Sequence, residues 1–443
     1  MRRRSRGSVP PKFSRETGER DRVLWAGLAP RLLRLLAADG RLDGRIVIVA
    51  AVAVYLLVVA VGRTVFGVDV WPALGVPSGP SLFFDTRNIT AALECHRLGY
   101  DPLFESPCDP WNRPMNYPRA WLVLRYLGIN QSHTDLLAVI FIVLFLVAFL
   151  LVVGRLTLGQ GLVGALAICS PSVMFAIERA NMDIVIFTIM AGAVLVWRSR
   201  PGVRSAVSPA LVTLGAIAKI YPVFALPVFL MARDRATRLV TVVCGGVFAV
   251  YVVGTRHDIA QVASIAPQGT EHAFGARILP AALLHLVTPE RWGAGEASKQ
   301  LIALVPLALL ALFVWVWARR RLSASEWEPL TWQLFAFGAG SLIFLGTFAI
   351  GNNFDYRLVF LLLTLPQLFA WAMQVADRRS GLAAGGIIVL IVFVWIGALS
   401  RPLALFDELA TWAMVSLLTL LIAATLPPLR IPRRKGQVRR NYL

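Results

Sequence analysis

Long uninterrupted runs of apolar residues alternate with short polar segments along most of this 443-residue chain. Runs such as 45–62, 136–153 and 301–318 approach the ~20 residues that a helix needs to cross a hydrocarbon core. Their apolar positions are continuous and do not alternate with period two, which favours helices over the strands of a membrane barrel. Because only helices or closed barrels satisfy their backbone in lipid, the pattern predicts an all-α polytopic membrane protein.

The pattern predicts about twelve transmembrane helices and two large polar loops, at about 67–134 and 255–298, of which the first contains short helices. The fifth and sixth spans are short and meet at Lys219-Ile220-Tyr221-Pro222, so a re-entrant hairpin that lines a cavity is an alternative there. The predicted spans are 46–66, 135–154, 160–177, 183–198, 204–218, 220–232, 237–254, 299–318, 330–350, 357–374, 381–399 and 409–427.

Composition and charge agree with this class and orient the chain. Apolar residues make up 57%, charged residues 16%, and the mean hydropathy is +0.67, which is too apolar for a soluble protein of this length. The net charge of +19 then reports topology, because cytoplasmic loops collect Lys and Arg, and nucleic-acid binding is the weaker interpretation. With both termini cytoplasmic, every predicted inner loop is basic: Arg155; Arg198, Arg200 and Arg204; Arg233, Arg235 and Arg238; Arg319 to Arg321; Arg378 and Arg379.

This topology divides the chain into a cytoplasmic basic tail at 1–44, a transmembrane domain at 45–429 and a second cytoplasmic basic tail at 430–443. All five histidines and several acids then fall on the outer face, whereas no charged residue lies near the middle of a well-defined span. Intramembrane charges mark the substrate paths of secondary transporters. The sequence therefore favours an enzyme that acts on a lipid with a polar head group at the outer boundary.

The first loop carries two cysteines, Cys95 and Cys108, thirteen positions apart. A disulfide between them fits an oxidising outer compartment and would stabilise the loop by roughly 3 kcal/mol; two free thiols are the alternative. No Cys and His pair has the spacing of a zinc site. The sequence gives no reason to expect a metal or a cofactor.

Asp85 stands where a helix over 86–98 is predicted to begin, with Gly99 as its end. An acid at such a position can be a cap. It can also be a general base, because a carboxylate at the membrane surface can take the proton of an acceptor hydroxyl as that hydroxyl attacks. Asp69, nearer the end of the first span, is a less favoured candidate for this base.

Several segments together resemble a known family. They are Asp85; Ala91-Ala92; Leu98-Gly99-Tyr100-Asp101-Pro102; Asn116-Tyr117-Pro118; Glu178-Arg179-Ala180-Asn181-Met182-Asp183; Ala218-Lys219-Ile220-Tyr221-Pro222; and Asn353-Phe354-Asp355-Tyr356-Arg357-Leu358. Over about residues 80–370 the chain resembles the family 87 glycosyltransferases, the polyprenol-phosphate-mannose-dependent mannosyltransferases of the GT-C class. It departs from them at position 180, where Ala replaces an expected Gly, and in a longer, more cysteine-rich first loop.

The resemblance implies a GT-C-type bundle and an inverting transfer of a sugar, mannose in the first place, from a polyprenyl-phosphate donor. It further implies a cell-envelope glycolipid or polysaccharide as acceptor. Together with the predicted topology, it leads us to expect a bacterial plasma membrane enzyme with an extracytoplasmic active site. Asp85 matches the general base. The charge of the leaving phosphate calls for cations, and Lys219, Arg357 and Arg179 are the candidates.

Other candidates for substrate binding have structural alternatives. Glu178, Asn181 and Asp183 touch the sugar or fix their turn. Asp355 forms part of the site, or it is a helix cap or a local pair with Arg357. Tyr117 stacks on a sugar or belongs to the interfacial aromatic belt, while His257 and His272 lie in a loop that closes over the acceptor or is solvated. Lys219 contacts phosphate, reaches out to the surface, or forms a structural ion pair.

Three rival functions remain open. A lipid-linked glycan polymerase or ligase shares this topology but uses an oligosaccharide-diphosphate donor. A secondary transporter predicts two repeated halves and polar groups at the midplane. A non-catalytic scaffold predicts indifference to Asp85.

Overall fold

The computed structural model describes residues 42–266, 272–276, 329–374, 379–396 and 404–426, with a few isolated positions between 278 and 316. The predicted span at 299–318 and most of the second predicted loop lie outside these residues. So do almost all of the two predicted basic tails.

The regular secondary structure of the described chain is helical apart from two short strands. Strands β1 (Ala273–Phe274) and β2 (Asn353–Phe354) pair antiparallel. The helices are α2 (Arg45–Val65), η1 (Pro72–Leu74), α3 (Phe84–Arg97), η2 (Arg119–Leu127), η3 (Gln131–His133), α4 (Thr134–Val153), α5 (Leu158–Ile168), α6 (Pro171–Glu178), α7 (Met182–Trp197), α8 (Pro201–Ala218), η4 (Tyr221–Met231), α9 (Arg235–Gly254), α10 (Arg256–Ile265), α13 (Trp332–Ile350), η5 (Asp355–Thr364), α14 (Leu365–Met373), α15 (Arg379–Ile396) and α16 (Ala404–Thr425).

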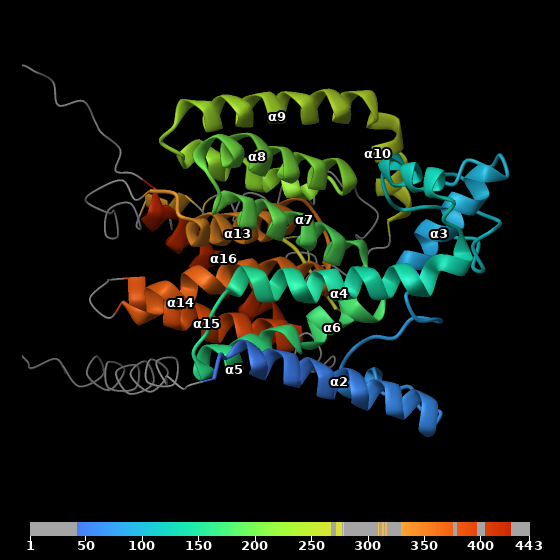
Figure 1. The fold of residues 1–443 in the computed structure, drawn as a ribbon, viewed down its shortest axis with the longest axis horizontal. Helices are drawn as coiled ribbons and strands as arrows, with labels where there is room; N and C mark the ends of the chain where they lie inside the picture. Colours follow the sequence, from blue (N-terminus) through green and yellow to red (C-terminus); the bar gives the residue numbers. More distant parts are fainter. Residues whose placement is uncertain are drawn as a thin grey trace, which may run out of the picture.

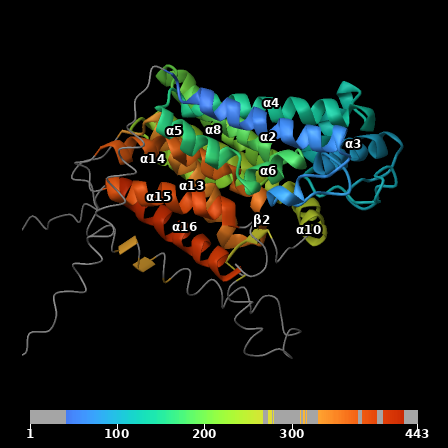
Figure 2. The ribbon, with the colours of Figure 1, turned by 90° about the horizontal axis from the view of Figure 1, so that it is seen from below.

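The long helices lie side by side in a bundle, and α3 and α10 gather at one end of it (Figure 1). We call this the α3 end and define it by residues 66–133, 178–182, 218–221, 254–266, 272–276 and 350–355. The view turned by 90° places β2 and α10 at the same end and α16 along the opposite flank from α4 (Figure 2). The α3 end therefore collects loop segments that are far apart in the sequence.

Membrane-spanning helices are present as the hydropathy pattern predicts. Seven described helices are long and apolar enough to cross a membrane, or eight if the pair α5 and α6 counts as one broken span. Two further apolar helices, α7 and η4, are shorter. The protein is an all-α multi-pass membrane protein, and the count of twelve spans stays a prediction.

The predicted third span is not one straight helix. Helices α5 and α6 meet at an angle of 55°. Ser170 ends the continuity, because its hydroxyl accepts a hydrogen bond from the backbone N–H of Val173 and thereby caps α6. Pro171 follows at the first helical position, where its missing N–H costs nothing. The break therefore lies at Cys169 and Ser170, and the single span predicted at 160–177 is wrong at this point.

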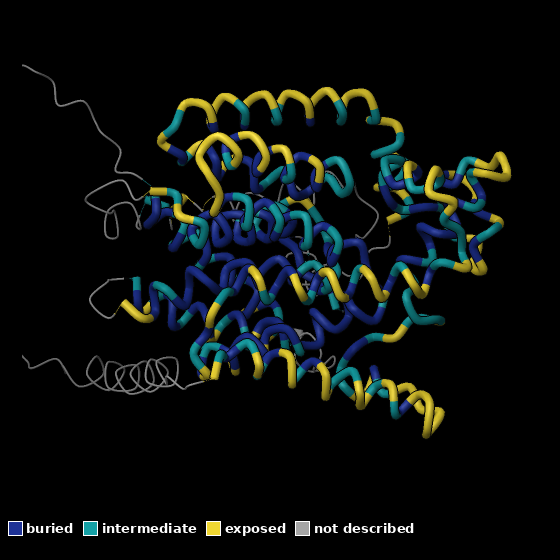
Figure 3. Tube along the Cα trace, viewed as in Figure 1, coloured by how far each residue is buried: buried dark blue, intermediate teal, exposed yellow. Residues whose placement is uncertain are grey.

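Two apolar cores hold the molecule together. The larger one fills the bundle with aromatic rings, among them Phe229, Phe335 and Trp197, whose centroids lie 4.6–5.7 Å apart. The smaller one belongs to the first loop and packs Leu93, Leu103 and neighbours against Met182 of α7. Figure 3 shows the buried residues in the middle of the bundle and the exposed ones along α9 and the outer side of α2. The first loop is thus a packed unit docked on the bundle.

Helix α2 meets α5 through a contact between two glycines. A Cβ atom on Gly161 would overlap the carbonyl group of Gly44, and a Cβ atom on Gly44 would overlap the carbonyl of Thr157. The N–H of Gly44 also donates to the carbonyl of Leu156 at 2.8 Å. Only residues without a side chain allow the two backbones to come this close.

Replacing Gly161 with alanine is therefore expected to lower the free energy of unfolding by about 1–3 kcal/mol, the usual cost of overpacking. The measurement is thermal unfolding of the purified protein in detergent. Gly246→Ala on α9 is the matched control, because its Cβ would meet no atom within 4 Å, and alanine favours a helix by up to about 1 kcal/mol. Equal unfolding midpoints for the two variants would contradict the close approach.

Candidate functional site

The first turn of α3 is docked on the turn between α6 and α7. The N–H of Phe83 donates to the carbonyl of Glu178 at 3.1 Å, and the N–H of Asp85 donates to the carbonyl of Arg179 at 3.2 Å. The hydroxyl of Thr86 donates to the carbonyl of Ala180 at 2.7 Å. Three successive carbonyls of the turn are thereby satisfied, and Asp85 is held against it.

Asp85 is only 9% exposed, and its carboxylate points into the docked turn. Its Oδ2 accepts a hydrogen bond from Nδ2 of Asn181 at 2.5 Å. Its Oδ1 accepts one from Nη1 of Arg179 at 3.4 Å. The interpretation of Asp85 as a cap is wrong. Helix α3 begins at Phe84, one residue before Asp85, and its N-cap residue is Phe83, whose side chain makes no capping hydrogen bond.

Asn181 connects Asp85 to a second acid. Its Oδ1 accepts from the N–H of Asp183 at 2.9 Å, which makes Asn181 the N-cap of α7. The same oxygen accepts from Nζ of Lys219 at 3.1 Å. Asn181 is 1% exposed, so both ends of its amide are used inside the protein.

Asp183 is fully buried and is held by three groups. Nζ of Lys219 lies 2.6 Å from its Oδ1, the hydroxyl of Tyr221 donates to the same oxygen, and Nε of Arg357 lies 3.8 Å from its Oδ2. The Lys219 side chain is only 12% exposed, so the interpretation in which it reaches out to the surface is wrong. A buried charge needs such a partner, and the ion pair is the state the structure describes.

Lys219 owes its position to the break between α8 and η4. The chain breaks here, as both interpretations of this segment require: α8 ends at Ala218, and η4 begins at Tyr221. Pro222 and Pro227 lack the N–H that a regular α-helix needs, and η4 is a 3-10 helix. The indole N–H of Trp121 in the first loop donates to the carbonyl of Ala218 at 2.9 Å. The hairpin tip is therefore tied to the first loop.

Arg357 and Asp355 do not form the local pair that was one alternative. Arg357 donates to the side chain of Asn353 and faces Asp183. Asp355 is 4% exposed, and its N–H donates to the carbonyl of His272 at 2.9 Å. The pairing of β1 with β2 thus places His272 beside Asp355, while the side chain of Arg357 points toward Asp183.

Three tyrosine rings surround the ammonium of Lys219. Its Nζ lies 5.2 Å from the ring of Tyr117, 5.8 Å from that of Tyr221 and 5.7 Å from that of Tyr356. At such distances a ring attracts a cation. Tyr117 is 3% exposed, and burial raises the pKa of its hydroxyl well above 10, so it is neutral and belongs to the site, not to an interfacial belt.

We define the acid–base cluster as Asp85, Arg179, Asn181, Asp183, Lys219 and Arg357. It holds three cations and two carboxylates, a formal excess of one positive charge. Nε of Arg179 and Nε of Arg357 are buried and have no hydrogen-bond partner in the described part of the chain. Oδ2 of Asp183 has no hydrogen-bond partner there either. The cluster thus keeps two guanidinium donors of the kind that bind carboxylates and phosphates.

The remaining predicted site residues lie at its edge or outside it. Oε1 of Glu178 accepts from the N–H of Gly79 at 3.0 Å, so this acid fixes the segment before α3. The ring of His272 lies 6.4 Å from that of Phe175. His257 is exposed on α10, apart from the cluster.

Strained backbone flanks the cluster. Of the four described residues other than glycine that have positive φ, three lie here: Phe83 at 58°, Ala180 at 42° and His272 at 53°. Such residues cost of order 1–3 kcal/mol each and gather at functional sites. The sequence signal for one of them was the expected glycine at position 180. Tyr221, Tyr356 and Asn353 also contribute, and they stood in the quoted segments without an assigned role.

The first loop is held in place by covalent and ionic contacts. Cys95 and Cys108 form a disulfide with their Cα atoms 5.5 Å apart. Arg119 joins the loop to α10, since its guanidinium lies 2.7 Å from Asp101 and 2.9 Å from Asp258. The hydrogen bond from Arg119 holds the pKa of Asp101 below its usual range. We call this pair of contacts the Arg119 clasp.

Comparisons of the chain with protein-family models, with curated proteins and with solved structures find no match. Within the described residues, no group of three or more His, Cys, Asp or Glu side chains is arranged to hold a metal ion. The class that fold and site define is therefore a multi-pass membrane protein with a buried acid–base cluster at one end of its bundle.

Replacing Ala180 with glycine is expected to leave the unfolding temperature unchanged or to raise it. Glycine removes the steric cost of the left-handed conformation, which stabilises the folded state by about 1–2 kcal/mol. It also makes the unfolded chain more flexible, which lowers the free energy of unfolding by about 0.5–1 kcal/mol. Thermal unfolding in detergent measures the sum. The control is Ala176→Gly in α6, which is expected to destabilise by about 1 kcal/mol; a similar loss at position 180 would show that the positive φ carries no strain.

Proposed function

We propose that this protein is an integral membrane glycosyltransferase of the GT-C type. It transfers a sugar, in the first place mannose, from a polyprenyl-phosphate donor to a glycolipid or polysaccharide acceptor of the cell envelope. The observation that carries the proposal is the joining of a buried carboxylate, Asp85, to three cations in one cluster. The resemblance of the same residues to family 87 glycosyltransferases supports it.

The cluster matches the two demands of sugar transfer. Asp85 takes the proton of the acceptor hydroxyl as that oxygen attacks the anomeric carbon. The bond from this carbon to the phosphate oxygen breaks, and its electron pair leaves with the phosphate. Lys219, Arg357 and Arg179 offset the charge that develops on the phosphate. Attack from the side opposite the leaving group inverts the anomeric centre.

The charge of the cluster favours a monophosphate donor over a diphosphate donor. Three cations and two carboxylates leave an excess of one positive charge, which equals the single negative charge of a sugar phosphodiester. A polyprenyl-diphosphate donor brings two negative charges. This count favours the transferase over the polymerase or ligase.

Exposed arginines at the other end of the bundle support an extracytoplasmic site. Arg155, Arg198, Arg200, Arg233 and Arg235 are exposed in the segments that join α4 to α5, α7 to α8 and η4 to α9. Segments of this kind are retained in the cytoplasm. With those segments inside, the α3 end and its cluster face outward in a bacterial plasma membrane.

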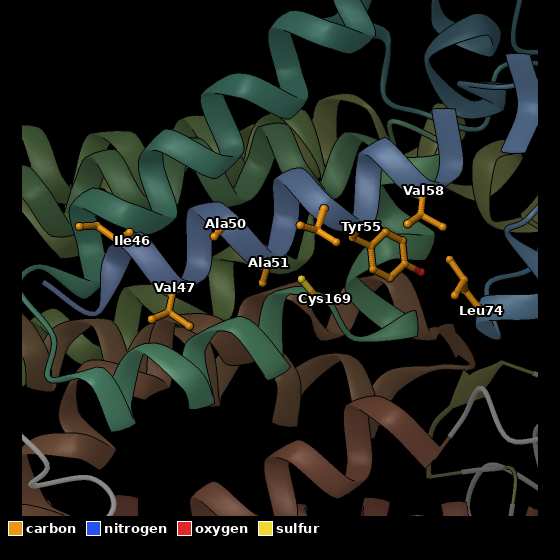
Figure 4. Close-up of a pocket in the computed structure, with 9 residues that line it drawn as sticks. Ile46, Val47, Ala50, Ala51, Tyr55, Val58, Leu74 and Cys169 are labelled. Atoms are coloured by element: carbon orange, nitrogen blue, oxygen red, sulfur yellow. The ribbon is translucent and has the colours of Figure 1, made fainter. Parts of the chain in front are cut away.

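An apolar groove along α2 suits the prenyl chain of the donor. It has a volume of about 720 Å³, and Figure 4 shows its side chains along α2, with Cys169 at the end of α5 and Leu74 beside them. Cys169 lies in the groove, and the eight residues of α6, ~12 Å of helix, lead from there to Arg179 of the cluster. Its lining is Ile46, Val47, Ala50, Ala51, Val54, Tyr55, Val58, Leu74 and Cys169.

Asp85→Asn tests the proposed base. This variant keeps a hydrogen-bond acceptor of the same size but cannot take a proton, so kcat is expected to fall at least a hundredfold, the usual contribution of a general base being 10²–10⁴-fold. The assay uses purified protein with polyprenyl-phosphate mannose and a cell-envelope glycolipid extract. Asp69→Asn is the matched control and also tests the less favoured base: Asp69 is exposed, and its side chain accepts a hydrogen bond from the nearby N–H of Trp71.

Near-normal turnover by Asp85→Asn would remove Asp85 as the base. Turnover by the wild type with a diphosphate-linked donor and none with the monophosphate donor would replace the transferase with the polymerase or ligase. Equal losses in the Asp69 and Asp85 variants would reject a specific role for the cluster.

Ala50→Trp tests the groove. The larger side chain is expected to fill it and to raise KM about tenfold for a long-chain polyprenyl-phosphate donor, with little change for a citronellyl analogue of two isoprene units. Val49→Trp is the control, because Val49 is 52% exposed and does not line the groove. An identical change in KM for both donors, or for both variants, would place the prenyl chain elsewhere.

A further inference from the structure

The side-chain amide of Asn181 links Asp85, the proposed base, directly to Lys219, a proposed phosphate ligand. Its Nδ2 donates to Oδ2 of Asp85 at 2.5 Å. Its Oδ1 accepts from Nζ of Lys219 at 3.1 Å. No second described side chain bonds both to Asp85 and to Lys219.

We propose that Asn181 is a positioning residue that couples protonation of Asp85 to phosphate binding by Lys219. The inference rests on the proposed function and adds to it an order of events inside the site. Asn181 itself touches neither the sugar nor the phosphate in this proposal.

The coupling follows from the polarisation of one amide. While Asp85 is charged, it draws the Nδ2 protons of Asn181 and makes Oδ1 a stronger acceptor, because hydrogen bonds in a chain polarise one another. Oδ1 then holds Lys219 close. When Asp85 takes the acceptor proton, this polarisation is lost and Lys219 is held less tightly.

The same proton transfer frees Arg179, which loses its charged partner at 3.4 Å. The cluster then carries an excess of two positive charges where it carried one. The leaving group changes in parallel, because a sugar phosphodiester with one negative charge becomes a prenyl phosphate with two. The positive charge of the protein and the negative charge of the phosphate therefore increase together. Proton transfer to Asp85 and departure of the phosphate thus support each other.

By linkage, the effect works in both directions. A site in which Asp85 is neutral must bind a prenyl phosphate more tightly than one in which it is charged. Asp85→Asn imitates the neutral state without any sugar or acceptor. Binding of farnesyl phosphate thus reads the coupling independently of turnover.

The experiment is a double-mutant cycle on the full-length protein in nanodiscs. Farnesyl phosphate affinity is measured by calorimetry for wild type, Asp85→Asn, Asn181→Ser and the double variant. Asp85→Asn is expected to raise the affinity about five- to tenfold, the lower part of the usual range of coupling between sites. In the Asn181→Ser background the same change is expected to raise it by a clearly smaller factor, about two- to threefold, because the release of Arg179 and the lost charge of Asp85 do not act through Asn181.

We call the two hydrogen bonds of the Asn181 amide, to Asp85 and from Lys219, the bridge. Serine is chosen because it removes the bridge and keeps the helix cap. Asn181 also caps α7, and serine is an equally good cap, but its short side chain cannot reach both partners. Asn181→Thr gives a second variant with the same properties if the serine variant does not fold. Asn88→Ser is the matched control: Asn88 is 3% exposed and bonds to the carbonyls of Arg113 and Pro114, so the coupling must survive its loss.

The outcomes separate the bridge from the function on which it rests. Coupling that persists undiminished in Asn181→Ser or Asn181→Thr overturns the bridge and leaves the phosphate site intact. Coupling lost equally in Asn88→Ser assigns it to the fold at large and also overturns the bridge. Absence of farnesyl phosphate binding in wild type and Asp85→Asn alike rejects the phosphate site and with it the proposed function.

Discussion

The buried ion pair between Asp183 and Lys219 is the constraint on which the α3 end depends. Both charges lie out of water, Asp183 completely and the Lys219 side chain at 12% exposure, and removing one partner of such a pair costs about 3–5 kcal/mol. The pair fixes the hairpin tip between α8 and η4 against the start of α7. The pair is surrounded by Asn181, Tyr221 and Arg357, each of which contacts one of the two charged groups. Asn181 in turn holds Asp85.

Much of the fold follows from local sequence. The run of apolar residues in α4 is a span on hydropathy alone, and the prolines at 222 and 227 mark η4 as irregular. The bend between α5 and α6 was also readable, from Ser170 and Pro171, but an apolar stretch long enough to cross a membrane hid it. Hydropathy averages over a window, whereas a helix break depends on two residues.

The site itself was predictable only as a set of residues. Asp85 and Asn181 are 96 positions apart, and nothing local tells which oxygen a side chain will meet across such a separation. Local rules left a cap open for Asp85 and a pair open between Asp355 and Arg357. Tertiary contacts overrode both, because a buried carboxylate is stabilised more by cations and amide donors than by the first turn of its own helix.

The Arg119 clasp has a consequence for how the α3 end responds to its surroundings. Its two acids come from segments 157 positions apart, Asp101 in the first loop and Asp258 in α10, and all three side chains are at least a quarter exposed. Exposed ion pairs weaken as dissolved salt screens them over a Debye length of about 8 Å at physiological ionic strength. Higher ionic strength therefore loosens the attachment of α10 to the first loop, by at most about 1 kcal/mol for each of the two pairs.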